Sequence, residues 1–448
     1  MSIKDIGHVD FFNHSCIYIQ DDMELLIVPS DAKDNILPLD SKYDYKLQFV
    51  DSLKQTGIAS IKRGSAGLDN CIRLELDYIA KLVYSAFIDE FIMVGNEIDE
   101  FFSPLEHYFP LKHNDKYVPS DLLYGHETAA SYQFVVENIC INVSLVFGNV
   151  LSNGIRSDLT IHPQLIIRFE KSQDIDFAFR VSNIVKTFLQ FVLRKRKLNL
   201  KALDLYNTTD EKKSYVGYLF SSMFNVDLHS NTRPDASFRC YGKKIENILS
   251  LISSDKSFPI NHLNEEHHNP FYYTAERFGA LCSAFEYEYG QSIDTYTKIG
   301  CEYDEIREKL ISSLETVDIR DNIEKQFQKD AIEKIKSLGK QHGFKRKIIT
   351  AYQTNESALN KSINNILSRE KSIEKIARQL SDLRGKVLHN EMGYQFSEQE
   401  IEAIRFLEIL QFVMTLRRAE YLDSEIEIIV GALYHCNILY LDLYKKSE

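Results

Sequence analysis

The amino-acid sequence predicts an α+β protein in which a β-rich mixed N-terminal domain precedes an all-helical C-terminal domain. Short segments of alternating or continuous apolar residues, typical of strands, dominate the first part of the chain. From about residue 271 onward, apolar residues recur instead at i, i+3 and i+4, as in helices that bury one stripe. At 448 residues the chain is long enough for two or three domains, each with its own core.

Several N-terminal segments have strand patterns, and two pairs of them are arranged as hairpins. The polar residues Gln20-Asp21-Asp22 separate the first pair, and Glu137-Asn138 form a tight turn between the second pair. We expect these strands to form an antiparallel sheet with one face covered. The predicted strands cover residues 16–19, 25–28, 72–78, 133–136, 139–147 and 165–170.

After these strands, apolar residues between 177 and 192 recur at helical spacing, which predicts a helix that covers the sheet. The basic cluster Arg194-Lys-Arg-Lys follows, where the helix dipole favours positive charge. The polar segment 261–270 ends in a proline and is the best domain boundary. We therefore predict a β-rich α/β domain over 1–265, with a further break near 155 if it has two subdomains, and a helical bundle over 266–448. A sensing or regulatory role for the first domain is implied only by the family resemblance described below.

The C-terminal domain is predicted to contain seven helices. Ser397 and Glu400 form a capping box, because the serine hydroxyl can accept from a free amide while the glutamate reaches back to the serine amide. The predicted helices cover residues 271–289, 303–314, 322–338, 357–367, 371–388, 397–418 and 424–440.

Composition excludes several kinds of site. The seven cysteines are scattered without close pairs, which argues against a disulfide framework or a zinc ribbon. The adjacent His267-His268 pair has no carboxylate or cysteine at ligand spacing, so we predict no metal and no cofactor. Without a signal peptide or a long apolar run, the chain is expected to be cytoplasmic and to bind no membrane.

Charge is unevenly distributed along the chain. The net charge is -12, which argues against one large polyanion-binding surface. The segment from Lys334 to Lys386, however, contains thirteen lysines and arginines and only four acidic residues, which gives it a local charge of +9. This segment is either a solvated helical face or a local site for nucleic acid.

Arg384 has an unusual position in the predicted helix 371–388. If Ile373 is placed at zero on a helical wheel, Arg384 lies at about 20°, within the apolar stripe that contains Ala377, Leu380 and Val387. A buried guanidinium needs a partner or an anion, because an unpaired buried charge costs several kcal/mol. His389 follows five residues later and can approach Arg384 if the helix ends there. Such a pair suits metal-free phosphodiester cleavage, with histidine moving a proton and arginine stabilising charge on phosphate.

The Arg-His spacing by itself is not specific to catalysis. A similar spacing occurs between Arg156 and His162, in a polar connection before a strand. For Arg384 and His389, the structural alternative is an arginine at a helix end beside a satisfied surface histidine. Spacing alone favours that alternative.

The residues around Arg384 resemble a known family. The phrase Leu383-Arg384-Gly385-Lys386-Val387-Leu388-His389-Asn390 is similar to the Arg-x4-6-His motif of HEPN-superfamily nucleases, and Ala284-Phe-Glu-Tyr resembles their first helix. The whole chain, with its β-rich first half, resembles ApeA-like anti-phage abortive-infection proteins. Gly385 departs from the family motif, because active members commonly have a polar residue directly after the motif arginine.

The resemblance implies a metal-independent endoribonuclease in which Arg384 and His389 carry catalysis. It implies a homodimer or higher homo-oligomer with two facing motifs, RNA products that end in a 2′,3′-cyclic phosphate, and a phage-derived activator. RNA is the expected partner, tRNA being one candidate. The alternative is a catalytically inactive HEPN module for dimerisation or nucleotide binding, and a third interpretation is a purely structural interaction protein. The residues expected to bind the RNA backbone are Lys345, Arg346, Lys347, Lys386 and Asn390.

Overall fold

The computed structural model divides the chain into two compact units, Met1–Phe258 and Pro259–Glu448. Every strand of the described chain lies in the first unit, and the described part of the second is built from helices. The predicted α+β architecture, with strands first and helices second, is confirmed at this level. The structure describes residues 4–12, 14–31, 45–51, 55–66, 71–83, 87–102, 128–150, 160–209, 212–221, 238–264, 272–292, 301–337, 343–366, 372–390 and 394–434.

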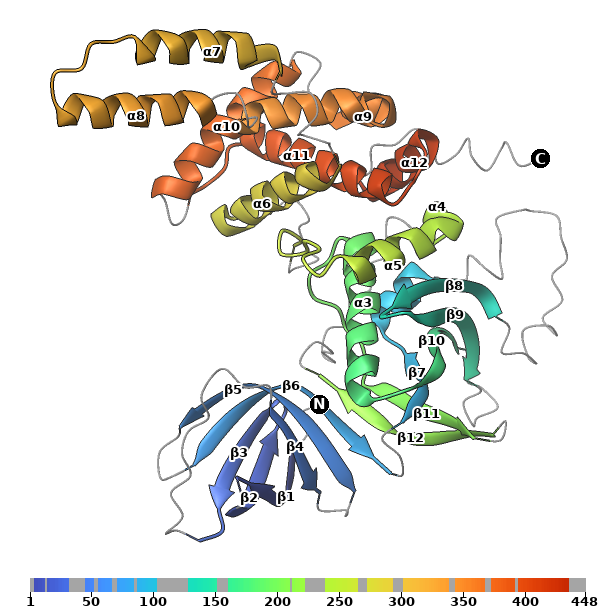
Figure 1. Ribbon diagram of the computed structural model, residues 1–448. Coiled ribbons are helices and arrows are strands. Elements are labelled where there is room, and N and C mark those ends of the chain that lie inside the picture. Colours follow the sequence, from blue (N-terminus) through green and yellow to red (C-terminus); the bar gives the residue numbers. More distant parts are fainter. Residues whose placement is uncertain are drawn as a thin grey trace, which may run out of the picture. The chain divides into compact units, whose positions relative to one another are not determined.

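The first six strands form a small antiparallel barrel (Figure 1). Hydrogen-bonded neighbours follow the order β3-β2-β1-β4-β5-β6, and an additional pairing of β3 with β6 closes the ring. Because closure leaves no free edge among these strands, it removes a common site of unwanted strand pairing. The strands are β1 (Lys4–Phe11), β2 (His14–Asp21), β3 (Glu24–Pro29), β4 (Tyr45–Val50), β5 (Thr56–Ala66) and β6 (Ile72–Leu82).

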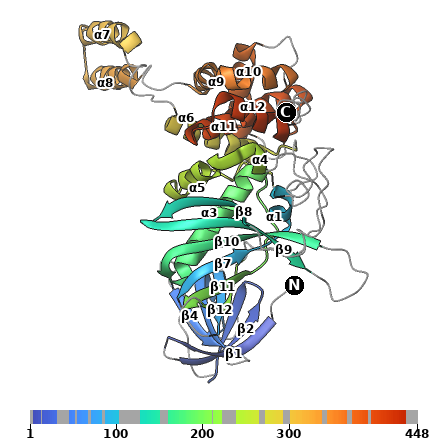
Figure 2. The same cartoon turned by 90° about the vertical axis from the view of Figure 1, so that its right-hand side faces the viewer.

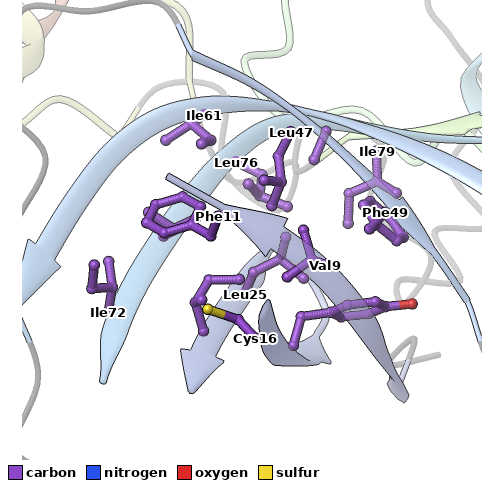
Figure 3. Packing of buried hydrophobic residues seen from close by; sticks show 14 of the residues in the cluster. Val9, Phe11, Cys16, Leu25, Leu47, Phe49, Ile61, Ile72, Leu76 and Ile79 are labelled. Atoms are coloured by element: carbon purple, nitrogen blue, oxygen red, sulfur yellow. The ribbon is translucent and has the colours of Figure 1, made fainter. Parts of the chain in front are cut away.

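Alternate side chains of these strands fill the barrel. In β2 and β3, buried and exposed positions alternate, as the two-residue period of a strand requires. Figure 3 shows the inward-pointing residues in contact, among them Phe11, Leu25, Leu47, Phe49 and Leu76, all of which are buried. The barrel therefore has its own apolar core.

One lysine is enclosed within this region by acidic partners. Lys81 Nζ lies 2.7 Å from Asp5 Oδ2 and 3.3 Å from Asp51 Oδ2, and the three side chains are 8%, 9% and 2% exposed. The Tyr18 hydroxyl donates to Asp5 Oδ2 over 3.1 Å. Burial lowers the pKa of Lys81, but hydrogen bonds to Asp5 and Asp51, together with the charges of Tyr218 and Asp5, outweigh it, so that the pKa is raised overall. We call these residues the Lys81 cluster.

A second antiparallel sheet continues from the barrel in the order β12-β11-β7-β10-β9-β8. Strand β6 belongs to both: its residues 72–75 pair with β3, and its residues 79–82 pair with β12. The helix α3 (Ile175–Leu193) packs along this sheet, and α5 (Ile245–Ser254) contacts α3 and β8 (Figure 1). The strands are β7 (Ile88–Met93), β8 (Thr128–Val136), β9 (Ile139–Val150), β10 (Thr160–Gln173), β11 (Leu203–Thr209) and β12 (Lys212–Phe220), and the short helices are α1 (Asn96–Phe101), α4 (Phe238–Tyr241) and η2 (Gly242–Lys244).

Local sequence signals explain the turns and helix ends of this unit. Glu137 and Asn138 have φ values of 50° and 67°, and the predicted turn between β8 and β9 is confirmed. The Asp174 carboxylate accepts from the Phe177 amide over 2.8 Å and caps the start of α3. Arg194, with φ 56°, ends the same helix in the left-handed conformation.

One feature of this unit differs from the sequence-based expectations. The strands form a barrel and a second sheet, whereas a single sheet with one covered face was predicted, because the pairing of β3 with β6 has no local sequence signal. The suggested break near 155 lies in residues 151–159, outside the described part. Those residues connect β9 to β10, which pair with each other from Val150 and Thr160 onward, so they join two strands of one sheet.

The helical unit is organised around α11, whose middle is buried on nearly all sides. Helices α6, α9, α10 and α12 all contact it. Its predicted capping box is confirmed, since the Glu400 amide donates to Ser397 Oγ while Glu400 Oε2 accepts from the Ser397 amide. The helices are α6 (Ala275–Ser292), α7 (Cys301–Glu315), α8 (Asn322–Ser337), α9 (Phe344–Ile366), α10 (Ile373–Asn390), α11 (Glu398–Arg418) and α12 (Asp423–Leu433).

Buried polar contacts join the first and central helices of this unit. The Tyr273 hydroxyl donates to Glu408 Oε2 over 2.6 Å, and Arg277 Nη2 lies 3.2 Å from the same oxygen. On the next turns of α6, Glu288 Oε1 lies 3.1 Å from Arg418 Nε. These pairs fix α6 against α11 and thereby set the position of Glu286, which lies between them in the sequence.

None of the helices in the described ranges is both long enough and apolar enough to cross a membrane.

Candidate active site

Helix α10 holds Arg384 at the edge of its buried stripe. Among residues 373–387 of this helix, whose side chains are described, the buried ones are Ile376, Ala377, Leu380, Leu383 and Val387. The Arg384 side chain is 30% exposed. The prediction that Arg384 lies in the middle of a dry stripe is therefore wrong in degree, because the buried residues centre between Leu380 and Val387, about 50° from Arg384 on the helical wheel.

The Arg384 guanidinium has two partners from other helices. Its Nη2 lies 2.7 Å from Glu286 Oε2 of α6. Its Cζ lies 4.6 Å from the centre of the Phe344 ring, on the first residue of α9. The carboxylate balances the charge and the ring covers one face of the guanidinium plane. These contacts supply the pairing that the sequence position of Arg384 requires.

A second cation shares the same carboxylate. Lys347 Nζ, also on α9, lies 2.5 Å from Glu286 Oε1. Each oxygen of Glu286 thus faces a different positive charge, and all three side chains are between one fifth and one third exposed. We call this group the Arg384–Glu286–Lys347 cluster. With two cations and one anion it has a formal charge of +1, and it remains open to water.

Cys282 lies one helical turn before Glu286 and borders the cluster. Burial raises the pKa of its thiol to about 12, while the charge of Arg384 lowers it and that of Glu286 raises it. At neutral pH the thiol is therefore protonated. Because only the thiolate is a strong nucleophile, Cys282 is not suited to covalent catalysis.

The second predicted catalytic residue, His389, occupies the last turn of α10. The helix extends to Asn390, so Arg384 and His389 are part of one continuous helix. Five residues of α-helix advance about 7.5 Å and turn about 140°. The side chains of His389 and Asn390 lie outside the described residues.

The residues predicted to bind RNA are distributed over different surfaces. Lys347 is engaged by Glu286, and its neighbour Arg346 lies close enough to Tyr289 to affect the pKa of that phenol. Lys386 is exposed, and its charge contributes to the lowered pKa of Glu400 at the start of α11, where hydrogen bonds from Ser397 outweigh the effect of burial. Lys345 is half-buried on α9. The structure therefore places Lys347 at Arg384 and Lys386 nearer to α11.

The competing sequence features lie largely outside the described chain. Arg156 falls within residues 151–159 and the pair His267-His268 within 265–271, both of which lie outside it. His162 is part of β10, and its side chain is likewise not described. Among the residues that the structure does describe, no group of three or more His, Cys, Asp or Glu side chains could hold a metal ion.

Sequence reasoning missed two members of the site. Glu286 belongs to the segment Ala284-Phe-Glu-Tyr, which the family resemblance already singled out, but nothing in the sequence paired its carboxylate with Arg384. Phe344 begins the part of α9 that was not predicted to be helical. Comparison of the chain with protein-family models, with curated proteins and with solved structures finds no match.

Proposed function

We propose that this chain is a metal-independent endoribonuclease of the HEPN type, in which Arg384 and His389 act on a phosphodiester bond of RNA. The observation that carries the proposal is the Arg384 guanidinium, which is partly exposed and held by Glu286 and Phe344 of two other helices. The helix of Arg384 also bears His389 in its last turn. A guanidinium that is fixed in place and still reached by solvent can bind a phosphate oxygen.

In the proposed reaction, the ribose 2′-oxygen attacks the adjacent phosphorus and the bond from phosphorus to the 5′-oxygen breaks. His389 accepts the proton of the 2′-hydroxyl, and the leaving 5′-oxygen takes up a proton from a second imidazole or from water. Arg384 stabilises the negative charge that develops on the phosphate oxygens. The products are a 2′,3′-cyclic phosphate and a 5′-hydroxyl, and DNA is not cleaved because it lacks the attacking group.

Lys347 and Glu286 complete this proposed site. Lys347 adds a second positive charge beside Arg384, and Glu286 keeps both cations oriented before RNA binds. An incoming phosphate would compete with the carboxylate for the two cations. Since the cluster is partly open to water, this exchange does not require the bundle to unfold.

The decisive experiment is an RNA-end assay. The purified full chain is incubated with total RNA in EDTA, and new 2′,3′-cyclic phosphate ends are mapped. Arg384→Ala and His389→Ala should each reduce the cleavage rate by about 100-fold or more, the usual contribution of such groups. Arg378→Ala removes an exposed arginine from the same helix and is the matched control. Cleavage that survives both active-site changes, in proteins that remain helical by circular dichroism, would reject the assignment.

The alternative is a catalytically inactive HEPN module that dimerises or binds nucleotides. Two observations favour it: Gly385 follows the arginine, and Glu286 already neutralises part of the charge that a phosphate would meet. This alternative predicts RNA or nucleotide binding that Arg384→Ala weakens, with no new RNA ends under any condition.

The biological role proposed from the resemblance is that of an anti-phage abortive-infection effector, restrained until a signal reaches the β-rich unit. If so, expression of an active chain in infected bacteria should stop growth. Expression of the Arg384→Ala chain at the same level should not.

A further inference from the structure

The second sheet of the first unit packs against α3 on one side only. Figures 1 and 2 show α3 along one side of strands β7 to β10. Phe169 of β10 points toward this helix, because its ring centre lies 5.3 Å from that of Phe177 in α3. Since neighbouring residues of a strand point to opposite sides, Arg168 points to the side opposite α3.

Strand pairing places four residues in one row on that opposite side. Arg168 of β10 pairs with Glu90 of β7, and Glu90 pairs on its other side with Tyr206 of β11. Tyr206 pairs in turn with Tyr215 of β12. Residues directly opposite each other in antiparallel strands share a face, with Cβ atoms about 5 Å apart. The row therefore extends about 14 Å across four strands.

A buried carboxylate anchors two cations in the middle of this row. The Glu90 side chain is only 5% exposed, and its Oε2 lies 2.6 Å from Arg168 Nε while its Oε1 accepts from Lys213 of β12. Lys213 Nζ also lies 4.0 Å from the centre of the Tyr206 ring. The side chains of Arg168 and Lys213 are themselves 58% and 40% exposed. Glu90 therefore holds both cations from within the sheet, and their outer sides face solvent.

The two cations keep hydrogen-bond donors for a further anion. Arg168 bonds to Glu90 through Nε alone, so neither of its Nη atoms has a partner in the described part of the chain. Such a pair of Nη groups can bind two oxygens of one phosphate through parallel hydrogen bonds. Lys213 adds a second charge on the other oxygen of Glu90. Together the cations suit one phosphate group.

Tyrosine rings and a carboxylate lie beside these cations. The Tyr206 and Tyr215 rings are 5.7 Å apart in an edge-to-face arrangement, and Tyr215 is 43% exposed. Asp204 precedes Tyr206 by two residues on β11, so it shares the same face, where it is exposed. It lies close enough to Tyr215 to help raise the pKa of that phenol, after the larger effect of burial. An exposed aromatic ring can stack on a nucleobase, and a carboxylate can accept from the amino group of the base.

We propose that this face of the second sheet binds a free mononucleotide. The phosphate lies between Arg168 and Lys213, the base stacks on Tyr215, and Asp204 accepts from the base or from a ribose hydroxyl. An acidic peptide would meet the cations but would be repelled by Asp204, and a neutral sugar would leave the cations without a partner. A phosphate joined to a planar ring uses all four side chains.

The proposal does not rest on the nuclease assignment, because all of these residues belong to the first unit. Its test is isothermal titration calorimetry of the full chain with AMP, GMP, CMP and UMP at low salt. At least one of them should bind with a dissociation constant below about 100 µM. The matching nucleoside and inorganic phosphate should each bind at least about tenfold more weakly, because each occupies only one half of the site.

Three substitutions locate the site on the sheet. Arg168→Lys keeps a cation beside Glu90 but removes the paired Nη groups, and Lys213→Ala removes the second charge. Tyr215→Ala removes the stacking surface and leaves both partners of Glu90 in place. Each should weaken binding at least about fivefold. Because Tyr215 is exposed and remote from the buried carboxylate, its loss tests the site even if a change at Glu90 disturbs folding.

Arg180→Ala is the matched control. Arg180 lies on α3, is 48% exposed and pairs with Glu137 over 3.2 Å, so it resembles Arg168 in exposure and pairing but points away from the proposed site. Its loss should leave the dissociation constant unchanged.

Three results would overturn the proposal. One is the absence of binding by all four mononucleotides at about 1 mM. Another is a dissociation constant that the substitutions at Arg168, Lys213 and Tyr215 leave unchanged, because the nucleotide would then bind elsewhere. The third is a single-stranded tetranucleotide that binds more than about tenfold tighter than the best mononucleotide, because the ligand would then be a nucleic-acid strand.

Discussion

The two units of this protein each contain a cation–carboxylate cluster, and the two clusters differ in enclosure and in charge. The Lys81 cluster surrounds one cation with two carboxylates, and its side chains are almost completely buried. The Arg384–Glu286–Lys347 cluster surrounds one carboxylate with two cations and is partly open to water. Enclosure fixes the partners of Lys81, so that cluster is structural. An open cluster with excess positive charge can accept a further anion, which makes Arg384 the candidate for function.

The largest effect predicted from this comparison concerns Lys81. Lys81→Met keeps much of the side-chain volume but leaves Asp5 and Asp51 buried without their cation. Breaking a buried ion pair from one side costs about 3–5 kcal/mol of unfolding free energy. Pulse proteolysis in urea, with barrel peptides quantified by mass spectrometry, measures this loss.

Lys62→Met is the matched control for that substitution. Lys62 pairs with Glu75 over 2.6 Å on the same barrel, but both side chains are about half exposed. Its loss should change the unfolding free energy by about 0.5 kcal/mol or less. If both substitutions lowered the unfolding free energy equally, burial of the ion pair would not be the source of the effect at Lys81.

The contribution of Lys81 should also depend on pH. Its pKa is raised in the folded protein from 10.5, so the stabilisation is complete below about pH 10.5 and is lost as the pH rises through the higher folded value. Burial also raises the pKa of the Tyr78 phenol to about 12, so wild type and variant alike lose further stability as the pH rises. The difference in unfolding free energy between wild type and Lys81→Met should therefore shrink as the pH rises above about 10.5. A difference that stays constant as the pH rises through this range, measured by circular dichroism, would show that the charge of Lys81 is not its source.

A smaller effect is expected at the open cluster. Glu286→Gln removes the anion that competes with phosphate for Arg384 and Lys347, so binding of a short single-stranded RNA should become about three- to tenfold tighter, equivalent to about 1 kcal/mol. Glu276→Gln, a fully exposed position on the same helix, is the control for net charge. Fluorescence anisotropy at constant salt measures both affinities. Weaker binding by Glu286→Gln would indicate that the carboxylate positions the cations and does not compete with the ligand.

The sequence was informative where structure depends on neighbours in the chain. The turn at Glu137-Asn138 and the capping box of Ser397 and Glu400 were predicted correctly because a few adjacent residues determine them. Most helices of the second unit were predicted to within a few residues from their apolar period. The first half of α9 was missed because the run Lys345-Arg346-Lys347 hides the buried positions Phe344 and Ile348.

What was not predicted depends on contacts between distant parts of the chain. Barrel closure requires β3 to pair with β6, and no composition or turn signal marks that pairing. The cluster around Arg384 combines residues of α6, α9 and α10. Sequence analysis recognised that Arg384 needed a partner, since a buried charge is unfavourable alone, but could not identify Glu286. The catalytic roles of Arg384 and His389 remain predictions.

The division of β6 between two neighbours limits how this protein can be shortened. A fragment that ends after β6 would expose the residues that pair with β12, and a fragment that begins after it would leave β12 as a bare sheet edge, prone to aggregate. The barrel and the second sheet are thus inseparable for expression. The smallest soluble N-terminal fragment should extend to Phe258, where the first unit ends.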